Sequence, residues 1–145
     1  MATRYSKYII TRCVNPEQRR EWSPAYNPQD RTKILSLDEE VVTGAKLYAN
    51  AVWFWPAMMK TAISERSTKP HVHTYDEVLG LIGTNPENPA DLCGETEVIL
   101  GGEKHLINKS ALIYIPAGLE HGPFRETRID RPIIHFECRS SGKHY

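Results

Sequence analysis

The alternation of apolar and polar positions along the chain predicts an all-β protein. Residues 96–107 form two alternating segments on either side of Gly101 and Gly102, which is typical of a β-hairpin. Other short apolar runs predict further strands at 71–83, 111–118, 120–126 and 131–139. Many short strands with frequent turns favour a sandwich or a small barrel.

The first half of the chain alternates less regularly. Residues 7–12 are rich in β-branched and aromatic side chains and predict one short strand. Residues 13–33 hold three prolines and many charges, so we expect irregular surface chain there. Residues 41–56 predict a strand, a break at Gly44 and a second strand, and residues 60–66 alternate again.

Composition narrows the class of protein without changing this prediction. The 145 residues suit one domain, and 40% hydrophobic and 25% charged residues are ordinary for a globular chain. The formal net charge is zero, which argues against a nucleic-acid surface or a polybasic membrane patch. We therefore expect neither nucleic acid nor a membrane as a partner.

The cysteines point to a reducing compartment. Cys13, Cys93 and Cys138 are odd in number and widely spaced, and no C-x-x-C pair suggests a zinc ribbon or a dithiol site. The N-terminal residues lack the apolar run of a signal peptide, and no later run is long enough to span a membrane. The sequence thus predicts a cytoplasmic protein.

The densest group of chemically active side chains lies at residues 71–77. His71 and His73 are two positions apart, so on a strand both side chains leave from one face. The polar step 74–76 can turn the chain and bring Glu77 opposite the pair. Two imidazoles and a carboxylate suit a divalent transition metal.

A second histidine motif supplies a fourth ligand. Pro116 and Gly118 predict a tight turn, because proline fixes its own φ and glycine permits a positive φ. His121 opens the strand that follows this turn. If that strand lies beside the first, His121 completes a set of three histidines and one carboxylate.

These two motifs resemble those of the cupin superfamily. The first reads His71-x-His73, three residues, Glu77 and then Gly83, and the second reads "PAGLEH", ending at His121. The resemblance covers about residues 47–138. It implies a double-stranded β-helix, or jelly-roll barrel, with the metal inside and His71, His73, Glu77 and His121 as ligands.

The resemblance also implies a division of the chain. Residues 1–46 become an N-terminal arm with one or two strands, 47–138 the barrel, and 139–145 a C-terminal tail. Barrels of this type resemble dimer formers, so a homodimer is expected.

The chain departs from the family pattern at three positions that are not ligands. Glu65 and Ser110 stand where the family has glycines, and Arg125 replaces the asparagine after the second motif. If Arg125 points inward, it places a cation suited to a substrate carboxylate near the metal. If it points outward, it is an ordinary surface arginine.

Other residues are weaker candidates for the site. Tyr75 and His135 are candidates for a catalytic base. A plain turn role fits Tyr75 equally well, and a core or surface position fits His135 better than a place in the site. Trp53 and Trp55 alternate with apolar neighbours, so both faces of their strand look buried. They either line the substrate pocket or belong to the core.

The predicted ligand set supports more than one function. Three imidazoles and one carboxylate leave a divalent metal (Mn, Fe, Ni, Co or Zn) with net positive charge and two open positions. Such a centre suits a lyase or isomerase acting on a small oxygenated, anionic compound. A dioxygenase with the same site and a non-catalytic small-molecule-binding or sensory protein are the alternatives.

Overall fold

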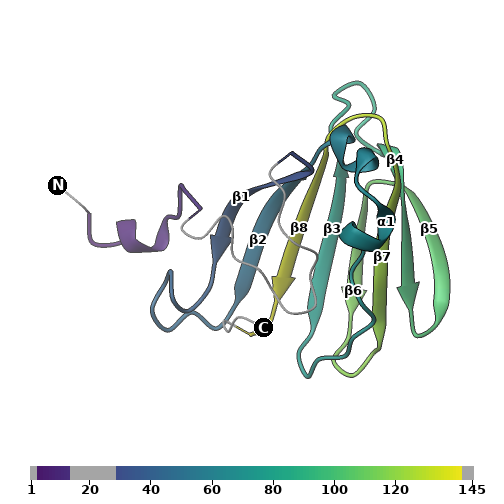
Figure 1. Cartoon of the computed structure of the whole chain (residues 1–145). Helices are drawn as coiled ribbons and strands as arrows, with labels where there is room; N and C mark the ends of the chain where they lie inside the picture. The colour runs from purple at the N-terminus through teal and green to yellow at the C-terminus, as the bar shows by residue number, and fades with distance from the viewer. Residues whose placement is uncertain (1–2, 14–28, 142–145) are drawn as a thin grey trace.

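Two antiparallel sheets face each other in the computed structural model, which describes residues 3–13 and 29–141 (Figure 1). The larger sheet has the strand order β1 (Arg31–Leu37), β2 (Tyr48–Phe54), β8 (Ile133–Arg139), β3 (Glu77–Gly83) and β6 (Ala111–Ile115). The smaller sheet has the order β5 (Glu103–Lys109), β4 (Asp91–Leu100) and β7 (His121–Ile129). The short helices are η1 (Ser6–Tyr8), η2 (Pro56–Lys60) and α1 (Ile63–Arg66).

One half of the space between the sheets is an apolar core. Alternate residues of β2, β3, β4 and β8 point inward, as the period of two requires. Phe54, Leu81, Leu92 and Ile133 form a buried cluster with Met58 of η2. These residues hold the two sheets together by removing apolar surface from water.

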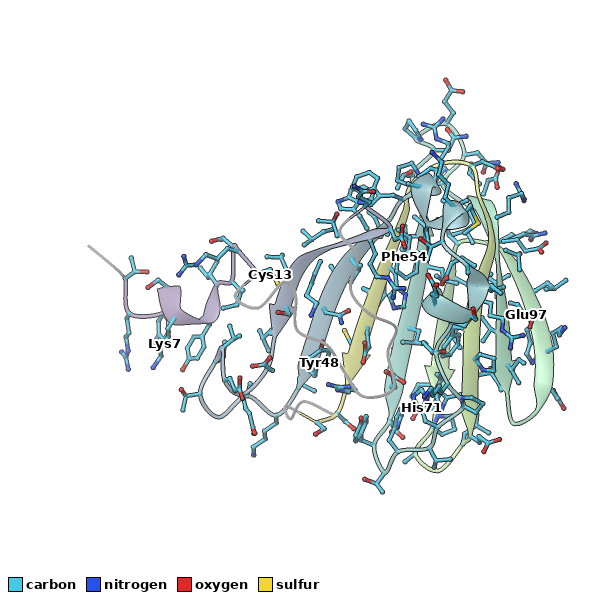
Figure 2. The ribbon with its side chains drawn as sticks, in the orientation of Figure 1. Lys7, Cys13, Tyr48, Phe54, His71 and Glu97 are labelled. Atoms are coloured by element: carbon cyan, nitrogen blue, oxygen red, sulfur yellow. The ribbon has the colours of Figure 1, made fainter. Side chains whose placement is uncertain are left out.

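The other half of the same interior is polar. Further along the same strands, the inward positions become Asn50, Glu77, Glu137 and Arg139, and all four are buried. Figure 2 shows Phe54 toward one end of the barrel and His71 toward the other. Because buried polar groups are costly unless they are paired, this half of the barrel must be organised by specific contacts.

Several predicted elements are present. Gly101 and Gly102 form the turn between β4 and β5 with φ of 55° and 83°, which confirms the predicted hairpin. The strands expected in the regions 111–118, 120–126 and 131–139 are observed as β6, β7 and β8. No helix in the described part of the chain is long and apolar enough to cross a membrane.

Two strand predictions in the first half were wrong, and one strand was missed. Residues 7–12 contain no strand, and η1 occupies the start of that run. Residues 41–44 form turns, because the Asp38 carboxylate accepts hydrogen bonds from the N–H groups of Glu40 and Val41. β1 lies in the arm predicted over residues 1–46, where a register shift between Lys33 and Leu35 interrupts its alternation.

The alternation of apolar and polar residues at 60–66 does not correspond to a strand. Residues Ile63–Arg66 form one helical turn, which Ser67 closes through two hydrogen bonds to the carbonyl of Ile63. A helix of this length is too short to show its period in the sequence.

We expect Gly83 to tolerate a side chain less well than Gly80. A Cβ at Gly83 would lie 2.0 Å from the backbone carbonyl oxygen of Asp91, whereas at Gly80 it would meet the Phe136 ring at the same distance. A ring can rotate away more easily than a backbone, so Gly83→Ala should lower the free energy of unfolding by about 3 kcal/mol and Gly80→Ala by about 1 kcal/mol. Urea unfolding measures both, and equal losses would contradict the prediction.

Candidate metal centre

Direct backbone pairing brings the two histidine motifs together. His71 and His121 form an isolated antiparallel bridge with N···O distances of 2.9 and 3.0 Å. The N–H of Gly118 also donates to the carbonyl of His73 at 2.9 Å. The turn around Gly118 (φ 85°) is therefore fastened to the segment that carries the first two histidines.

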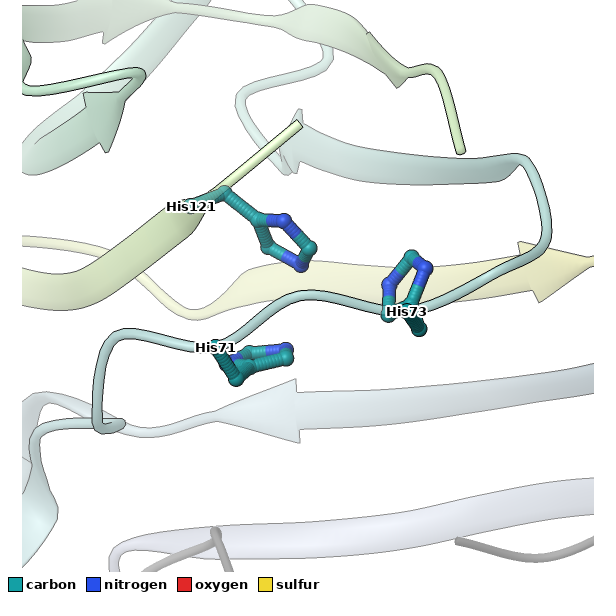
Figure 3. Close-up of side chains that lie close together, drawn as sticks. All are labelled: His71, His73 and His121. Atoms are coloured by element: carbon teal, nitrogen blue, oxygen red, sulfur yellow. The ribbon is translucent and has the colours of Figure 1, made fainter. Parts of the chain in front are cut away.

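The three imidazoles converge on one point (Figure 3). One ring nitrogen of each of His71, His73 and His121 lies within 4.8 Å of the others, a spacing at which they can hold a metal ion. Val72, between the first two, is 55% exposed, so the two-residue spacing places the histidines on one side as predicted. His121 is almost completely buried, His73 is buried and His71 is partly exposed.

The same hydrogen-bond pattern orients all three rings. Each Nδ1 lies beside a backbone carbonyl oxygen two residues away, at 2.8 Å for His71, 2.9 Å for His73 and 2.8 Å for His121. A neutral imidazole that donates from Nδ1 leaves the lone pair of Nε2 available. The backbone thus selects the tautomer that a metal requires at each position.

The Glu77 carboxylate lies against two of the three imidazoles. Its Oε2 lies 2.9 Å from Nε2 of His73 and 3.4 Å from Nε2 of His121. Burial raises the pKa of this carboxylate, but hydrogen bonding with His121, Glu137 and His73 outweighs burial and lowers it to about 2. Glu77 is therefore ionised at neutral pH and ready to bind a cation.

The pKa values of His71 and His121 are shifted in opposite directions. Burial lowers the pKa of His71, and the nearby His121 lowers it further. Burial also disfavours the charged form of His121, but the Glu77 carboxylate and the Leu119 carbonyl raise its pKa above the usual value. The Glu77 carboxylate therefore favours a positive charge at His121.

A second buried carboxylate lies behind Glu77, and the sequence analysis did not select it. Glu137 accepts hydrogen bonds from Arg139 at 3.1 Å and from Asn50 at 3.3 Å. Arg139 lies 3.8 Å from the centroid of the Tyr48 ring, a cation–π contact. Glu137 was recognisable only by its position on the same strand face as His135, and Arg139 lies just beyond the predicted end of the barrel.

Tyr75 lies next to the cluster and His135 does not. The Tyr75 ring stacks on His73 with centroids 4.2 Å apart and an angle of 8°. His135 instead stacks on Phe54 of the apolar half, and its Nδ1 bonds to the carbonyl of Gly80. The backbone of His135 pairs with that of Leu81 on β3. Leu81 is four residues from Glu77, which at the usual rise of a strand separates the two positions by roughly 13 Å.

Arg125, Trp53 and Trp55 lie away from the imidazoles. The Arg125 guanidinium bonds to Glu97 at 3.2 Å, on the outer face of the smaller sheet, so the outward placement is the one observed. Trp53 lies on the outer side of β2, opposite the buried positions, and its ring stacks on Trp55 at 5.4 Å. The predictions that Arg125 points inward and that Trp53 lines the substrate pocket are therefore wrong.

The Asp76 carboxylate links the turn of the first histidine motif to the turn before His121, a contact that we call the clasp. Its Oδ1 accepts a hydrogen bond from the N–H of Ala117 at 2.9 Å. Hydrogen bonds from Ala117 and from the Tyr114 hydroxyl lower the pKa of Asp76, so the carboxylate stays ionised. Its backbone also pairs with Ser140, which anchors the first turn to the end of β8.

Comparison with known proteins identifies the fold. Neither the family models nor the curated proteins searched match this sequence. A predicted oxalate decarboxylase from Thermotoga maritima superposes with a TM-score of 0.52 at 13% identity, covering 77% of this chain and 80% of that one. An oxalate oxidase in complex with the substrate analogue glycolate superposes with a TM-score of 0.51 at 16% identity, covering 87% and 59%.

These likenesses confirm the predicted jelly-roll barrel. The chain spans 54% and 59% of the length of two oxalate oxidase chains that it matches.

We expect Asp76 to set metal affinity without being a ligand. Asp76→Ala removes the acceptor that holds the turn before His121, so affinity should fall roughly tenfold, as for other groups that orient ligands. Asp76→Asn keeps an acceptor oxygen and should retain most of the affinity. Competition with a chelating dye measures both.

The matched control for Asp76 is Glu87→Ala, which removes an exposed carboxylate from the 84–90 loop. Equal affinities for Asp76→Ala and this control would show that the clasp does not position the site.

The Glu77 carboxylate should stabilise the metal-free fold in a defined pH window. The pKa of Glu77 in the folded protein lies below its usual value of 4.5, so its contribution to stability is present above pH 4.5 and is lost as pH falls toward about 2. The folded pKa of His121 lies above 6.5, so its contribution is present below pH 6.5 and is lost as pH rises through the folded value. Glu77→Gln should therefore cost the most stability between pH 4.5 and 6.5.

Urea unfolding in EDTA at a series of pH values measures this window. Glu87→Gln is the control, since that carboxylate is exposed. A Glu77→Gln penalty that does not shrink below pH 4 would contradict the prediction.

Proposed function

We propose that this chain, which has the cupin fold, holds one divalent transition metal and uses it as a lyase or isomerase on a small oxygenated anion. The observation that carries the proposal is the shared orientation of His71, His73 and His121. Three nitrogens lie within 4.8 Å of one another, and each ring has its other nitrogen bonded to the backbone. A packed histidine cluster without a ligand has no need of such matched tautomers.

The donor set fits a transition metal. Three imidazole nitrogens and the Glu77 carboxylate suit Mn, Fe, Ni, Co or Zn, and leave room for further ligands on an octahedral ion. When bound, the ion would supply Lewis acidity to a substrate carbonyl or carboxylate. The buried pair of Glu137 and Arg139 would keep Glu77 in place and ionised behind the ion.

Charge favours an anionic substrate. One carboxylate and three neutral imidazoles leave a dication with net positive charge, and Glu77 is the acidic side chain in direct contact with the histidines. Two proteins of the same fold have names that point to oxalate chemistry, and one of them was solved with glycolate. We infer a small carboxylic or hydroxy acid as the substrate class.

Tyr75 is the residue that we propose to move the proton. Its ring lies against His73, and its backbone carbonyl fixes the same imidazole. Arg139 lies 5.6 Å from the centre of the Tyr75 ring, so a buried cation faces this ring. His135 is the weaker candidate because it packs against Phe54.

The same donors would also suit an oxygen-dependent reaction. Two of the structures with this fold are oxalate oxidases, which favours an oxidase or dioxygenase as the second candidate. A protein that binds its small molecule without turnover is the third.

The metal content of the protein purified without a histidine tag tests the proposal. We expect about one equivalent of a transition metal per chain, and His121→Ala should retain less than about one-tenth of an equivalent while the barrel stays folded. His105→Ala is the matched control, because His105 is an exposed imidazole on β5. Plasma mass spectrometry and circular dichroism give the two readouts.

Absence of metal from the wild-type protein after reconstitution would overturn the proposal. For the loaded protein, a screen of small carboxylic and hydroxy acids separates the three functions. Turnover without oxygen supports the lyase or isomerase, oxygen consumption supports the second candidate, and binding without turnover supports the third.

A further inference from the structure

The inner face of the larger sheet carries a row of polar side chains next to the metal centre. Ser36 of β1, Asn50 of β2 and Glu137 of β8 pair across neighbouring strands, and each is at most 7% exposed. We call these three residues the polar row. Arg139, two residues beyond Glu137 on β8, pairs with Glu77. The polar row is therefore the inward-facing layer of the barrel that follows the layer of the metal ligands.

Asn50 is the residue of the polar row with an unsatisfied acceptor. Its Nδ2 donates to the Tyr48 hydroxyl at 2.9 Å and to Oε2 of Glu137 at 3.3 Å, which occupies both hydrogens of the amide. Its Oδ1 is buried and has no hydrogen-bond partner in the part of the chain that the structure describes. A buried carbonyl oxygen without a donor costs free energy, so we expect a donor to bind there.

The neighbouring carboxylate fixes the direction of this amide. Glu137 accepts a hydrogen bond from the Arg139 guanidinium at 3.1 Å, so the pair holds Glu137 as an acceptor. Turning the Asn50 amide over would bring its oxygen against an oxygen of Glu137. The nitrogen therefore stays on the side of Glu137, and Oδ1 is the atom left to receive a donor.

We propose that Oδ1 of Asn50 accepts a hydrogen bond from a hydroxyl group of the substrate, which makes the substrate a hydroxylated acid. The inference rests on the proposed function, in which the acid group binds at the histidine cluster. An ammonium group is a poorer match, because the Arg139 guanidinium on the same carboxylate would repel it. The Ser36 hydroxyl, beside Asn50 in the polar row, is a second group that can bond to a hydroxyl.

The distance between the amide and the metal ligands sets the length of this acid. Asn50 and Glu77 lie on β2 and β3, which β8 separates, and Asn50 lies one inward-facing layer deeper. The usual strand spacing and rise then place their Cα atoms roughly 12 Å apart. Both side chains project into the barrel and shorten this gap. An acid whose hydroxyl lies about three or four carbons beyond the carboxylate carbon spans what remains.

The competing donor for Asn50 is a buried water molecule, which buried polar groups commonly bind. A water that serves only the amide would give no preference between an acid with a hydroxyl and one without it. A substrate hydroxyl that replaces such a water would give a clear preference, because the acid without it leaves the acceptor unpaired. Ligand specificity therefore distinguishes the two donors.

Isothermal titration calorimetry of the full chain loaded with zinc tests the inference. The probes are γ-hydroxybutyrate and δ-hydroxyvalerate, each compared with the acid that has a methyl group in place of the hydroxyl, valerate and caproate. The wild-type protein should bind at least one hydroxy acid roughly tenfold or more tightly than its methyl counterpart, because only the hydroxyl supplies a donor to Asn50. Affinities within about twofold in both pairs would overturn the inference.

Asn50→Leu removes the acceptor and keeps a side chain of similar shape. The preference for the hydroxy acid should fall roughly tenfold, to near one, because the leucine cannot accept a hydrogen bond. The preference compares two acids on the same protein, so a general loss of metal or ligand affinity cancels. A preference that Asn50→Leu leaves unchanged would contradict the inference. Asn50→Ala, with the same expected loss, replaces this variant if circular dichroism shows that Asn50→Leu does not fold.

The matched control is Asn108→Leu, which replaces an exposed asparagine on β5 of the smaller sheet. It should keep the wild-type preference, and an equal loss in this variant would overturn the inference. The metal content of each sample, measured by plasma mass spectrometry, separates this test from that of the proposed function. A chain that takes up no metal would overturn the function and the inference together, whereas a loaded chain without the preference would overturn the inference alone.

Discussion

The pairing of the His71 and His121 backbones is the constraint on which the site depends. These residues lie fifty positions apart in the chain, and two backbone hydrogen bonds hold them side by side. Because each ring is then fixed by a carbonyl two residues away, the backbone sets both the position and the tautomer of the imidazoles. The side chains need little reorganisation to bind a cation.

The division of the barrel into two halves follows from the cost of burying such a site. Phe54, Leu81, Ile133 and Met58 supply the apolar contacts that stabilise the fold, and they lie toward one end. The polar end depends on pairing, in which Arg139 donates a hydrogen bond to Glu137, and Glu77 lies against Nε2 of His73 and of His121. The core therefore stabilises a polar arrangement that could not stabilise itself.

The two faces of the larger sheet differ in their charge. Its inner face carries Glu77, Glu137 and Arg139, whereas its outer face carries none of the charges found on the smaller sheet. Tyr114 belongs to the outer face, and its hydroxyl bonds to Asp76 of the metal-site clasp. The end of β6 is thus linked to the turn that follows the first histidine motif.

The features that depend on short-range pattern could be predicted from the amino-acid sequence. The Gly101–Gly102 hairpin, the strands of the second half and the grouping of His71 with His73 follow from period and turn chemistry. The two histidine motifs also indicated the barrel, which the structural likenesses confirm. Each of these signals is contained within a few consecutive residues.

The face of the strand on which each polar residue lies could not be predicted, because it depends on contacts between distant strands. Arg125 pairs outward with Glu97, His135 packs with Phe54, and Glu137 and Arg139 meet beside Glu77. Register shifts in β1, β4 and β7 interrupt the alternation from which direction is inferred. Pairing between distant strands sets these directions, and no local pattern encodes a partner that lies far along the chain.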